Sequence, residues 1–284
     1  GELPFTAEVY QLLRQTDRPL PNNFSLRDIR QVLPEVVSVA QNKRAESRPG
    51  KKVFMFASTN YWLEHAVVTG LALVGLGHDV TLGYYPYSRW HVDIPLFDVR
   101  RQSMYARTVL RPAASIMNFE NLVRNNSSFV QLPDALLQAV NQVTDYDYMY
   151  AFQTEEVNRE HAFYTFRLER NMHAAKSLFS FLRSNKPEVA IIPNGTILEF
   201  GVAFRVCRFL KIPTTTYEFS EKRNSMWLAH NQEIMQQSTD DLWRVHTDYQ
   251  LSDEDLEQVR ILLSSRRNAS TYGDFSRKWQ RVPS

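Results

Sequence analysis

Apolar and polar positions alternate along the chain in blocks that predict strands joined to helices. Residues 189–193 are apolar and rich in β-branched side chains, which is typical of a strand buried on both faces. Asn194 and Gly195 follow, and both tolerate the positive φ of a tight turn. From 197 to 210 apolar residues recur at helical spacing, so one side of this helix can pack on a sheet. Residues 186–224 therefore predict strand, turn, helix, loop and strand.

A second unit of the same kind lies earlier in the chain. Residues 53–57 predict a buried strand, residues 63–76 a helix, and residues 79–85 the next strand. Two strands joined by a helix are expected to run parallel with a right-handed crossover. The predicted fold class is therefore α/β, with a Rossmann-like parallel sheet that carries helices on both faces.

The flanking segments are expected to be helical, which divides the chain into three parts. Residues 1–50 predict a helical lead-in, residues 51–245 the Rossmann-like domain, and residues 246–284 a C-terminal helix and tail. Capping boxes are expected where a helix-start residue precedes an acidic residue by three positions. Two such pairs are Ser25 with Asp28 and Ser252 with Asp255.

Between the two predicted strand–helix–strand units, the spacing of apolar positions is less regular. Residues 132–143 predict a helix and residues 148–152 a third strand. Thr154 is expected to cap the longest helix, which runs to about residue 185. Glu155 and Glu156 lie in its first turn, where they either interact with the helix dipole or contact an acceptor. Residues 226–235 are expected to be helical.

Composition narrows the function classes. The 33 basic and 31 acidic residues leave a net charge of +2, which argues against a nucleic-acid-binding protein that depends on backbone charge. The single cysteine, Cys207, is expected to be a buried core residue, so neither a disulfide framework nor a cysteine zinc site is predicted within one chain. With no secretory signal and no apolar run of about 18 residues, the expected location is the cytoplasm, either free or peripherally associated with the inner face of the membrane.

Polar residues follow three of the predicted strands. The carboxyl ends of parallel strands meet at one edge of a sheet, where open α/β sheets bind ligands. Backbone N–H groups at helix starts there can hold phosphate or sugar hydroxyls. The predicted substrate-binding residues are Ser58, Thr59, Asn60, Asn194, Gly195, Thr196, Arg223 and Asn224.

Two carboxylates at this edge are the catalytic candidates. Glu218 ends a strand and Glu199 lies one turn into a helix, and burial can tune the pKa of either into the range of a general base. The alternative for Glu218 is an ion pair with Arg223 or Lys222. His65 is expected to be a packing histidine. No Gly-x-Ser-x-Gly elbow is present, so a hydrolase with a nucleophilic triad is not supported.

No cofactor and no metal are predicted. The loop at 58–62 has no glycine and the second strand ends at Tyr85 without a carboxylate, so no dinucleotide site is predicted. Asp145 and Asp147 match the Asp-x-Asp pattern of metal-dependent glycosyltransferases, but they precede a predicted strand instead of following one. The aromatic stretch 84–91 is expected either to line a pocket or to pack a long loop.

Residues 186–195 and 211–218 resemble the N-terminal half of a GT-B glycosyltransferase, most closely the enzymes of bacterial surface polysaccharides. That family shows lysine-proline-acid, a buried strand and asparagine-glycine, then a helix, glycine-isoleucine-proline and another strand. Here Lys211 stands where the family has that glycine. The glycine-rich turn at 75–80 resembles the family's first βαβ unit, and the resemblance covers roughly residues 50–245.

The resemblance implies two Rossmann-like domains that face each other across a cleft. The C-terminal domain would bind the nucleotide-sugar donor, and the N-terminal domain would bind a glycan or lipid-linked acceptor. No second set of βαβ units follows residue 245, and the glutamate pair of many retaining members is missing. The expected function is therefore that of an acceptor-binding half, nearly inactive alone. A non-catalytic α/β nucleotide- or metabolite-binding module and a scaffold for a partner chain stay open as alternatives.

Overall fold

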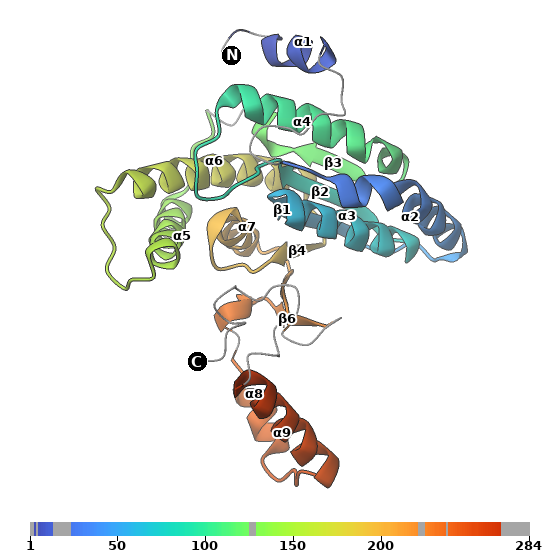
Figure 1. The fold of residues 1–284 in the computed structure, drawn as a ribbon, viewed down its shortest axis with the longest axis vertical. Helices are drawn as coiled ribbons and strands as arrows, with labels where there is room; N and C mark the ends of the chain where they lie inside the picture. Colours follow the sequence, from blue (N-terminus) through green and yellow to red (C-terminus); the bar gives the residue numbers. More distant parts are fainter. Residues whose placement is uncertain are drawn as a thin grey trace.

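The computed structural model describes residues 3, 5–13, 24–124, 129–220, 225–236 and 238–267. Its centre is a six-stranded sheet in the order β3-β2-β1-β4-β5-β6 (Figure 1). The first five strands run parallel and β6 is antiparallel to β5. The strands are β1 (Lys52–Ser58), β2 (Asp79–Tyr85), β3 (Asn118–Asn121), β4 (Val189–Pro193), β5 (Thr214–Phe219) and β6 (Met226–His230).

Helices cover both faces of this sheet, with α2, α3 and α4 on one face and α5, α6 and α7 on the other (Figure 1). The helices are α1 (Thr6–Leu13), α2 (Arg27–Glu46), α3 (Asn60–Gly75), α4 (Leu96–Leu110), α5 (Asp134–Phe152), α6 (Ala162–Asn185), α7 (Leu198–Phe209), α8 (Asp240–His246) and α9 (Asp253–Arg267). Short 3-10 turns are η2 (Arg111–Ser115), η3 (Leu122–Arg124) and η4 (Ile234–Gln236).

The central strand β1 shows why its sequence is apolar throughout. Val53, Met55 and Ala57 lie in the core under α2 and α3, whereas Phe54 and Phe56 lie in the core under α5, α6 and α7. Successive side chains of a strand point to opposite faces, so a strand covered on both sides needs apolar residues at every position. The α/β fold class and the parallel βαβ unit predicted from the sequence are therefore confirmed.

Two predicted boundaries in the middle of the chain were wrong. Residues 148–152 are the last turn of α5, because the buried positions Val140, Thr144 and Tyr148 continue a helical spacing through the aromatic stretch. The longest described helix, α6, begins at Ala162 and is capped by His161, whose Nδ1 accepts from the Phe163 N–H. Thr154 instead accepts from the Glu156 N–H in the loop before it.

The edge strands and one cap also differ from the prediction. Residues 226–230 form β6 instead of a helix, and the four-residue β3 has too little alternation to be read from the sequence. α2 begins at Arg27 with no side-chain cap, so the capping box at Ser25 was wrong. The capping box at α9 was right, since Ser252 Oγ accepts from the Asp255 N–H and Asp255 Oδ2 accepts from the Ser252 N–H.

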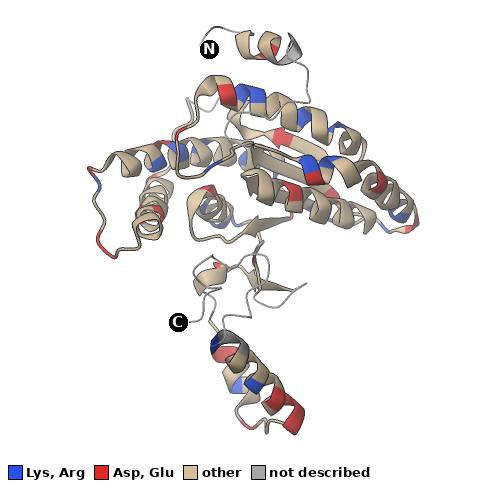
Figure 2. Cartoon of the chain, viewed as in Figure 1, with Lys and Arg blue, Asp and Glu red and all other residues tan. Residues whose placement is uncertain are grey.

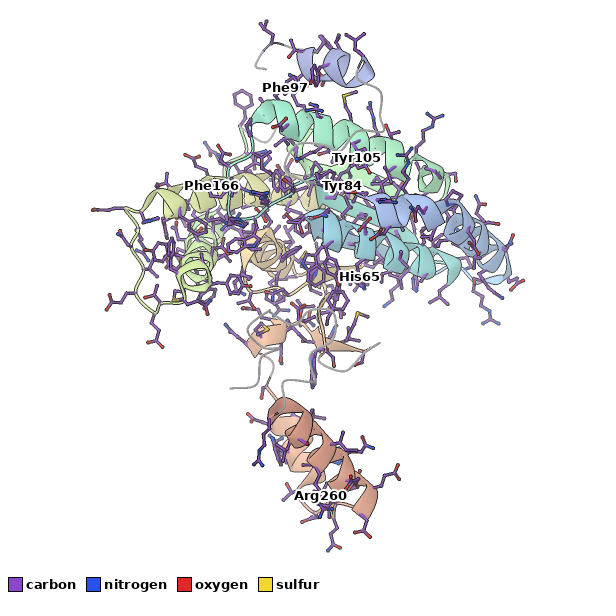
Figure 3. All side chains as sticks on the ribbon, viewed as in Figure 1. His65, Tyr84, Phe97, Tyr105, Phe166 and Arg260 are labelled. Carbon is purple, nitrogen blue, oxygen red and sulfur yellow. The ribbon has the colours of Figure 1, made fainter. Side chains whose placement is uncertain are left out.

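The last two described helices stand apart from the sheet. In Figure 1, α8 and α9 extend beyond β6, and Figure 3 shows side chains of α9 such as Arg260 directed into solvent. The predicted domain boundary at residue 245 falls inside α8 and stays a prediction. None of the described helices combines the length and the apolar character that crossing a bilayer requires.

One glycine is required where α7 meets the loop after β4. A Cβ on Gly201 would lie 2.4 Å from the backbone oxygen of Thr196, which cannot move without shifting the loop. We expect Gly201→Ala to lower the free energy of unfolding by about 1–3 kcal/mol, measured by urea denaturation. Gly75→Ala is the control, because its Cβ would meet Lys43 at an ordinary 3.4 Å. Equal effects of the two substitutions would contradict this close approach.

Candidate functional site

The loops after β1, β4 and β5 meet at one edge of the sheet, as parallel strands require. The Trp62 ring, just after the β1 loop, stacks on Phe219 at the end of β5 with 5.1 Å between ring centroids. Asn194 Nδ2, just after β4, donates to Glu218 Oε2 over 3.2 Å. The structure therefore brings the predicted polar loops to a common edge.

The end of β1 is buried, and the residue that follows it has a strained backbone. The Ser58 hydroxyl is buried and donates to Glu199 Oε2 over 3.2 Å. Thr59 adopts a φ of 72°, which is uncommon for a β-branched residue, and its carbonyl accepts from the Leu63 N–H at the start of α3. Asn60 is the first residue of that helix. Strain of this kind persists only where the surroundings hold the backbone in place.

The β4 loop uses Asn194 as a turn residue. Asn194 has a φ of 57°, and its Oδ1 accepts from the N–H groups of Thr196 and Ile197 at 3.0 and 3.2 Å. Gly195 has a φ of 83°, a conformation that favours glycine. The Thr196 hydroxyl is buried and has no hydrogen-bond partner among the described residues. The loop is thus held by its own hydrogen bonds and by those that join Asn194 to β5 and η4.

Glu218 has the properties that a general base needs. Burial raises its pKa, although hydrogen bonds from Asn194 and from the Phe219 N–H act in the opposite direction. A raised pKa brings the carboxylate closer to the working range of a proton acceptor. Its catalytic role stays a prediction. The predicted partners Lys222, Arg223 and Asn224 lie outside the described residues.

Trp227 is an aromatic residue at this site that the sequence reading missed. It pairs with Glu218 across the β5–β6 ladder, and it is 60% exposed. Residues opposite each other in a ladder project from the same face of the sheet. An open indole face therefore stands beside the half-buried carboxylate. The sequence predicted a helix at 226–235. Residue 227 lies next to residue 218 only when it is part of a strand, so this neighbour was not predicted.

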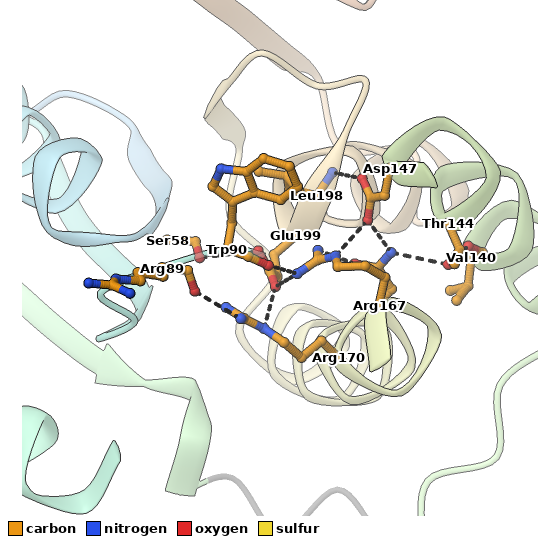
Figure 4. Close-up of polar contacts among 11 residues, drawn as sticks. Ser58, Arg89, Trp90, Val140, Thr144, Asp147, Arg167, Arg170, Leu198 and Glu199 are labelled. Carbon is orange, nitrogen blue, oxygen red and sulfur yellow. Dashed lines mark hydrogen bonds and ion pairs between the residues drawn. The ribbon is translucent and has the colours of Figure 1, made fainter. Parts of the chain in front are cut away.

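Glu199 belongs to a buried ion network, defined here as Asp147, Arg167, Arg170, Asn171 and Glu199 (Figure 4). The Arg167 side chain, on α6, is fully buried between two carboxylates. Its Nε donates to Asp147 Oδ2 over 2.9 Å, and its Nη1 donates to Glu199 Oε1 over 3.1 Å. Arg170 Nε donates to the same Glu199 oxygen over 3.0 Å.

Neutral donors complete the ion network around Asp147. Asn171 Nδ2 donates to Asp147 Oδ2 over 2.8 Å, and the Leu198 N–H donates to Asp147 Oδ1 over 2.6 Å (Figure 4). Leu198 opens α7 with a φ of 57°, so Asp147 fixes a strained helix start. The sequence signal for the network was a charged residue, Arg167, on the apolar stripe of α6.

The ion network sets the protonation state of Glu199. Burial alone would raise its pKa, but the Arg167 and Arg170 guanidiniums outweigh burial and hold the pKa at about 2. Burial raises the pKa of Asp147 against the opposing effect of Arg167. A carboxylate with such a low pKa is a weak base. The geometry therefore favours a positioning role for Glu199, and its catalytic assignment remains untested.

The Asp-x-Asp pattern does not form a joint metal site. Residues 145 and 147 lie on helix α5, where positions two apart face different directions. Asp147 faces Arg167, whereas Asp145 pairs with Arg159 over 2.9 Å. No group of three or more His, Cys, Asp or Glu side chains with metal-ligand geometry occurs in the described ranges.

A cavity of about 440 Å³, here called the edge pocket, opens beyond the carboxyl end of β2. Arg170 links it to the ion network, with its guanidinium 3.7 Å from the Tyr87 ring centroid. Arg170 Nη2 is buried and has no hydrogen-bond partner among the described residues. The lining residues are Tyr87, Asp93, Ile94, Pro95, Leu96, Val99, Val123, Phe166, Glu169, Arg170 and His173.

The walls of the edge pocket combine aromatic and polar groups. Phe166 on α6 and Tyr87 both line the pocket, and the Arg170 guanidinium lies near both rings. His173 bonds the Tyr85 hydroxyl over 3.4 Å, and burial lowers its pKa so that the neutral imidazole is favoured. Asp93 and Glu169 add two carboxylates. The predicted aromatic stretch thus serves both purposes, since Tyr85 and Tyr87 stack on each other and Tyr87 lines the pocket.

Removing one charge from the ion network should destabilise the fold. We expect Glu199→Gln to lower the free energy of unfolding by about 3–5 kcal/mol, because it leaves a buried guanidinium undercompensated. Chemical denaturation measures this change. Asp145→Asn is the matched control on the partly exposed pair with Arg159, and it should have a much smaller effect. A loss for Glu199→Gln no larger than for the control would be inconsistent with the network's role.

The lowered pKa of Glu199 predicts that the free energy of unfolding depends on pH in the acid range. The pKa of Glu199 is about 2 in the folded protein and near 4.5 when unfolded, so its stabilisation is complete above pH 4.5. That stabilisation, roughly 3 kcal/mol, is expected to disappear as the pH falls from 4.5 toward 2. The difference in unfolding free energy between the wild type and Glu199→Gln should therefore shrink over this range. A difference that stays constant with pH would disagree with the lowered pKa.

Comparisons with known proteins leave the family open. The chain matches no protein-family model, and no curated protein sequence matches it either. The function is therefore argued from the fold, the loops at the carboxyl edge and the edge pocket.

Proposed function

We propose that this chain is the acceptor-binding half of a glycosyltransferase with GT-B architecture, and that the edge pocket receives a sugar unit of the acceptor. The observation that carries the proposal is the composition of the edge pocket. It combines a buried guanidinium nitrogen that has no hydrogen-bond partner among the described residues, two carboxylates and two aromatic rings at the carboxyl edge of a parallel sheet.

These groups fit a polyhydroxylated ligand. The Asp93 and Glu169 carboxylates can accept hydrogen bonds from sugar hydroxyls, and Arg170 Nη2 can donate to a ring or hydroxyl oxygen. The faces of Tyr87 and Phe166 suit the apolar side of a sugar ring. A volume of about 440 Å³ lies within the range of small-molecule pockets.

The topology favours ligand binding at the same carboxyl edge, in the loops after β1 and β4, which do not line the edge pocket. The strand order reverses between β1 and β4, and open α/β sheets bind ligands at such switch points. The β1 loop carries no glycine to cradle a pyrophosphate. A nucleotide-sugar donor would accordingly be held by another domain facing this edge.

Glu218, at the end of β5, is the proposed base in that reaction, and it would act on a sugar unit of the acceptor outside the edge pocket, because β1 and β4 lie between the two places. The acceptor hydroxyl oxygen would form the new bond to the anomeric carbon of the donor, and its proton would pass to Glu218. The bond from the anomeric carbon to the nucleotide phosphate would break, and the phosphate would leave with the electron pair. The raised pKa of Glu218 and the open face of Trp227 beside it support this role.

The alternative is a nucleotide- or metabolite-binding module without catalysis. The same switch point would serve it. The two carboxylates of the edge pocket outnumber its single arginine, however, so an anionic nucleotide is the less favoured occupant.

Ligand-observed NMR with a panel of neutral mono- and disaccharides tests the proposal. We expect saturation transfer to at least one sugar, and binding weakened about tenfold by Asp93→Asn or Glu169→Gln, which each remove a charged acceptor. Glu35→Gln, at an exposed glutamate on α2, is the matched control and should bind as the wild type does. Transfer to nucleotides but to no neutral sugar would replace this proposal by the binding-module alternative.

A further inference from the structure

A second cavity lies on the face of the sheet that α4 covers, against the edge strand β3. It encloses about 650 Å³ between β3, the C-terminal half of α4 and η2. We call it the outer pocket. It shares no lining residue with the edge pocket and no member with the ion network. The lining residues are Tyr84, Ser103, Arg107, Thr108, Leu110, Arg111, Ala114, Met117, Asn118, Phe119, Glu120 and Asn121.

Two arginines give the outer pocket a positive wall. Arg107 lies in the last turn of α4 and Arg111 begins η2, so the two are four positions apart along nearly continuous helix. Residues at this spacing are neighbours on a helix surface. Neither guanidinium forms an ion pair within the described part of the chain. Figure 2 shows these basic segments toward the end of α4.

The floor of the outer pocket supplies an aromatic ring. Glu120 borders the pocket on β3, but it follows Phe119 directly, so its side chain projects from the opposite face of the sheet. Phe119, half-buried on the same strand, offers an apolar surface. Asn118 Nδ2 makes only a long contact of 3.5 Å, to Asp79 Oδ1. Glu120 is the one acidic residue in the lining, so the lining has a net positive charge.

We propose that the outer pocket binds a small phosphorylated molecule. Arg107 and Arg111 hold its phosphate, and Phe119 packs against its organic part. Guanidinium groups suit this task because their planar donors bind two phosphate oxygens at once. A cavity of about 650 Å³ is large enough for a phosphosugar or a nucleoside monophosphate. This inference does not depend on the proposed function, because it concerns a different cavity.

Titration of the full chain, followed by amide NMR and calorimetry, tests the outer pocket. The probes are inorganic phosphate, glucose 1-phosphate and AMP, with glucose as the unphosphorylated comparison. We expect all three phosphates to bind and to shift signals of α4 and β3, with one organic phosphate binding more tightly than inorganic phosphate. Glucose should leave those signals unchanged at the same concentration.

Three variants complete the test. Arg107→Gln and Arg111→Gln should each weaken phosphate binding by about tenfold or more, as expected for the loss of a charge-assisted contact. Arg208→Gln is the matched control, because Arg208 is an exposed arginine in the last turn of α7. Unchanged binding in the double variant of Arg107 and Arg111, or shifts confined to other elements, would overturn the proposal.

Discussion

The burial of one guanidinium constrains the carboxyl edge more than any other interaction. Arg167 has no exposed side-chain surface, so the loss of its hydration has to be offset by the carboxylates of Asp147 and Glu199. These partners come from α5 and α7, while Arg167 itself lies on α6. Ser58 extends the contact to the end of β1. Three helices and the central strand are thus fixed relative to one another through a single charged group.

This constraint reaches the ligand-binding edge through two neighbours. Leu198 holds its positive φ while its N–H is bonded to Asp147, so the network fixes the start of α7 beside the β4 loop. Arg170 shares the Glu199 oxygen with Arg167 and presents its guanidinium to Tyr87 in the edge pocket. A pocket whose donor is held by a buried network loses little freedom on binding. The outer pocket is lined by α4, η2 and β3 and contains no residue of the ion network, so this constraint does not act on it.

The sequence predicted the central strands of the sheet and missed the two edge strands, which are recognised only by the strand they pair with. β1 and β4 were readable because apolar runs mark strands covered on both faces. β2 and β5 were readable because β-branched and aromatic residues follow the end of a predicted helix. β3 and β6 lie at the sheet edges, where polar or exposed residues remove that signal. Strand β6 in particular places Trp227 beside Glu218, which no local pattern indicates. The ion network joins residues 147, 167 and 199, so its assembly depends on tertiary packing, although Glu199 was singled out by its place after β4.

A double-mutant cycle on Asp147 and Glu199 tests most directly whether Arg167 couples these elements. The two carboxylates bond opposite sides of the same guanidinium, so each substitution should alter the effect of the other. Asp147→Asn, Glu199→Gln and the double variant are compared by their free energies of unfolding. The account predicts a coupling energy of about 1 kcal/mol or more. Effects that add within about 0.3 kcal/mol would contradict it.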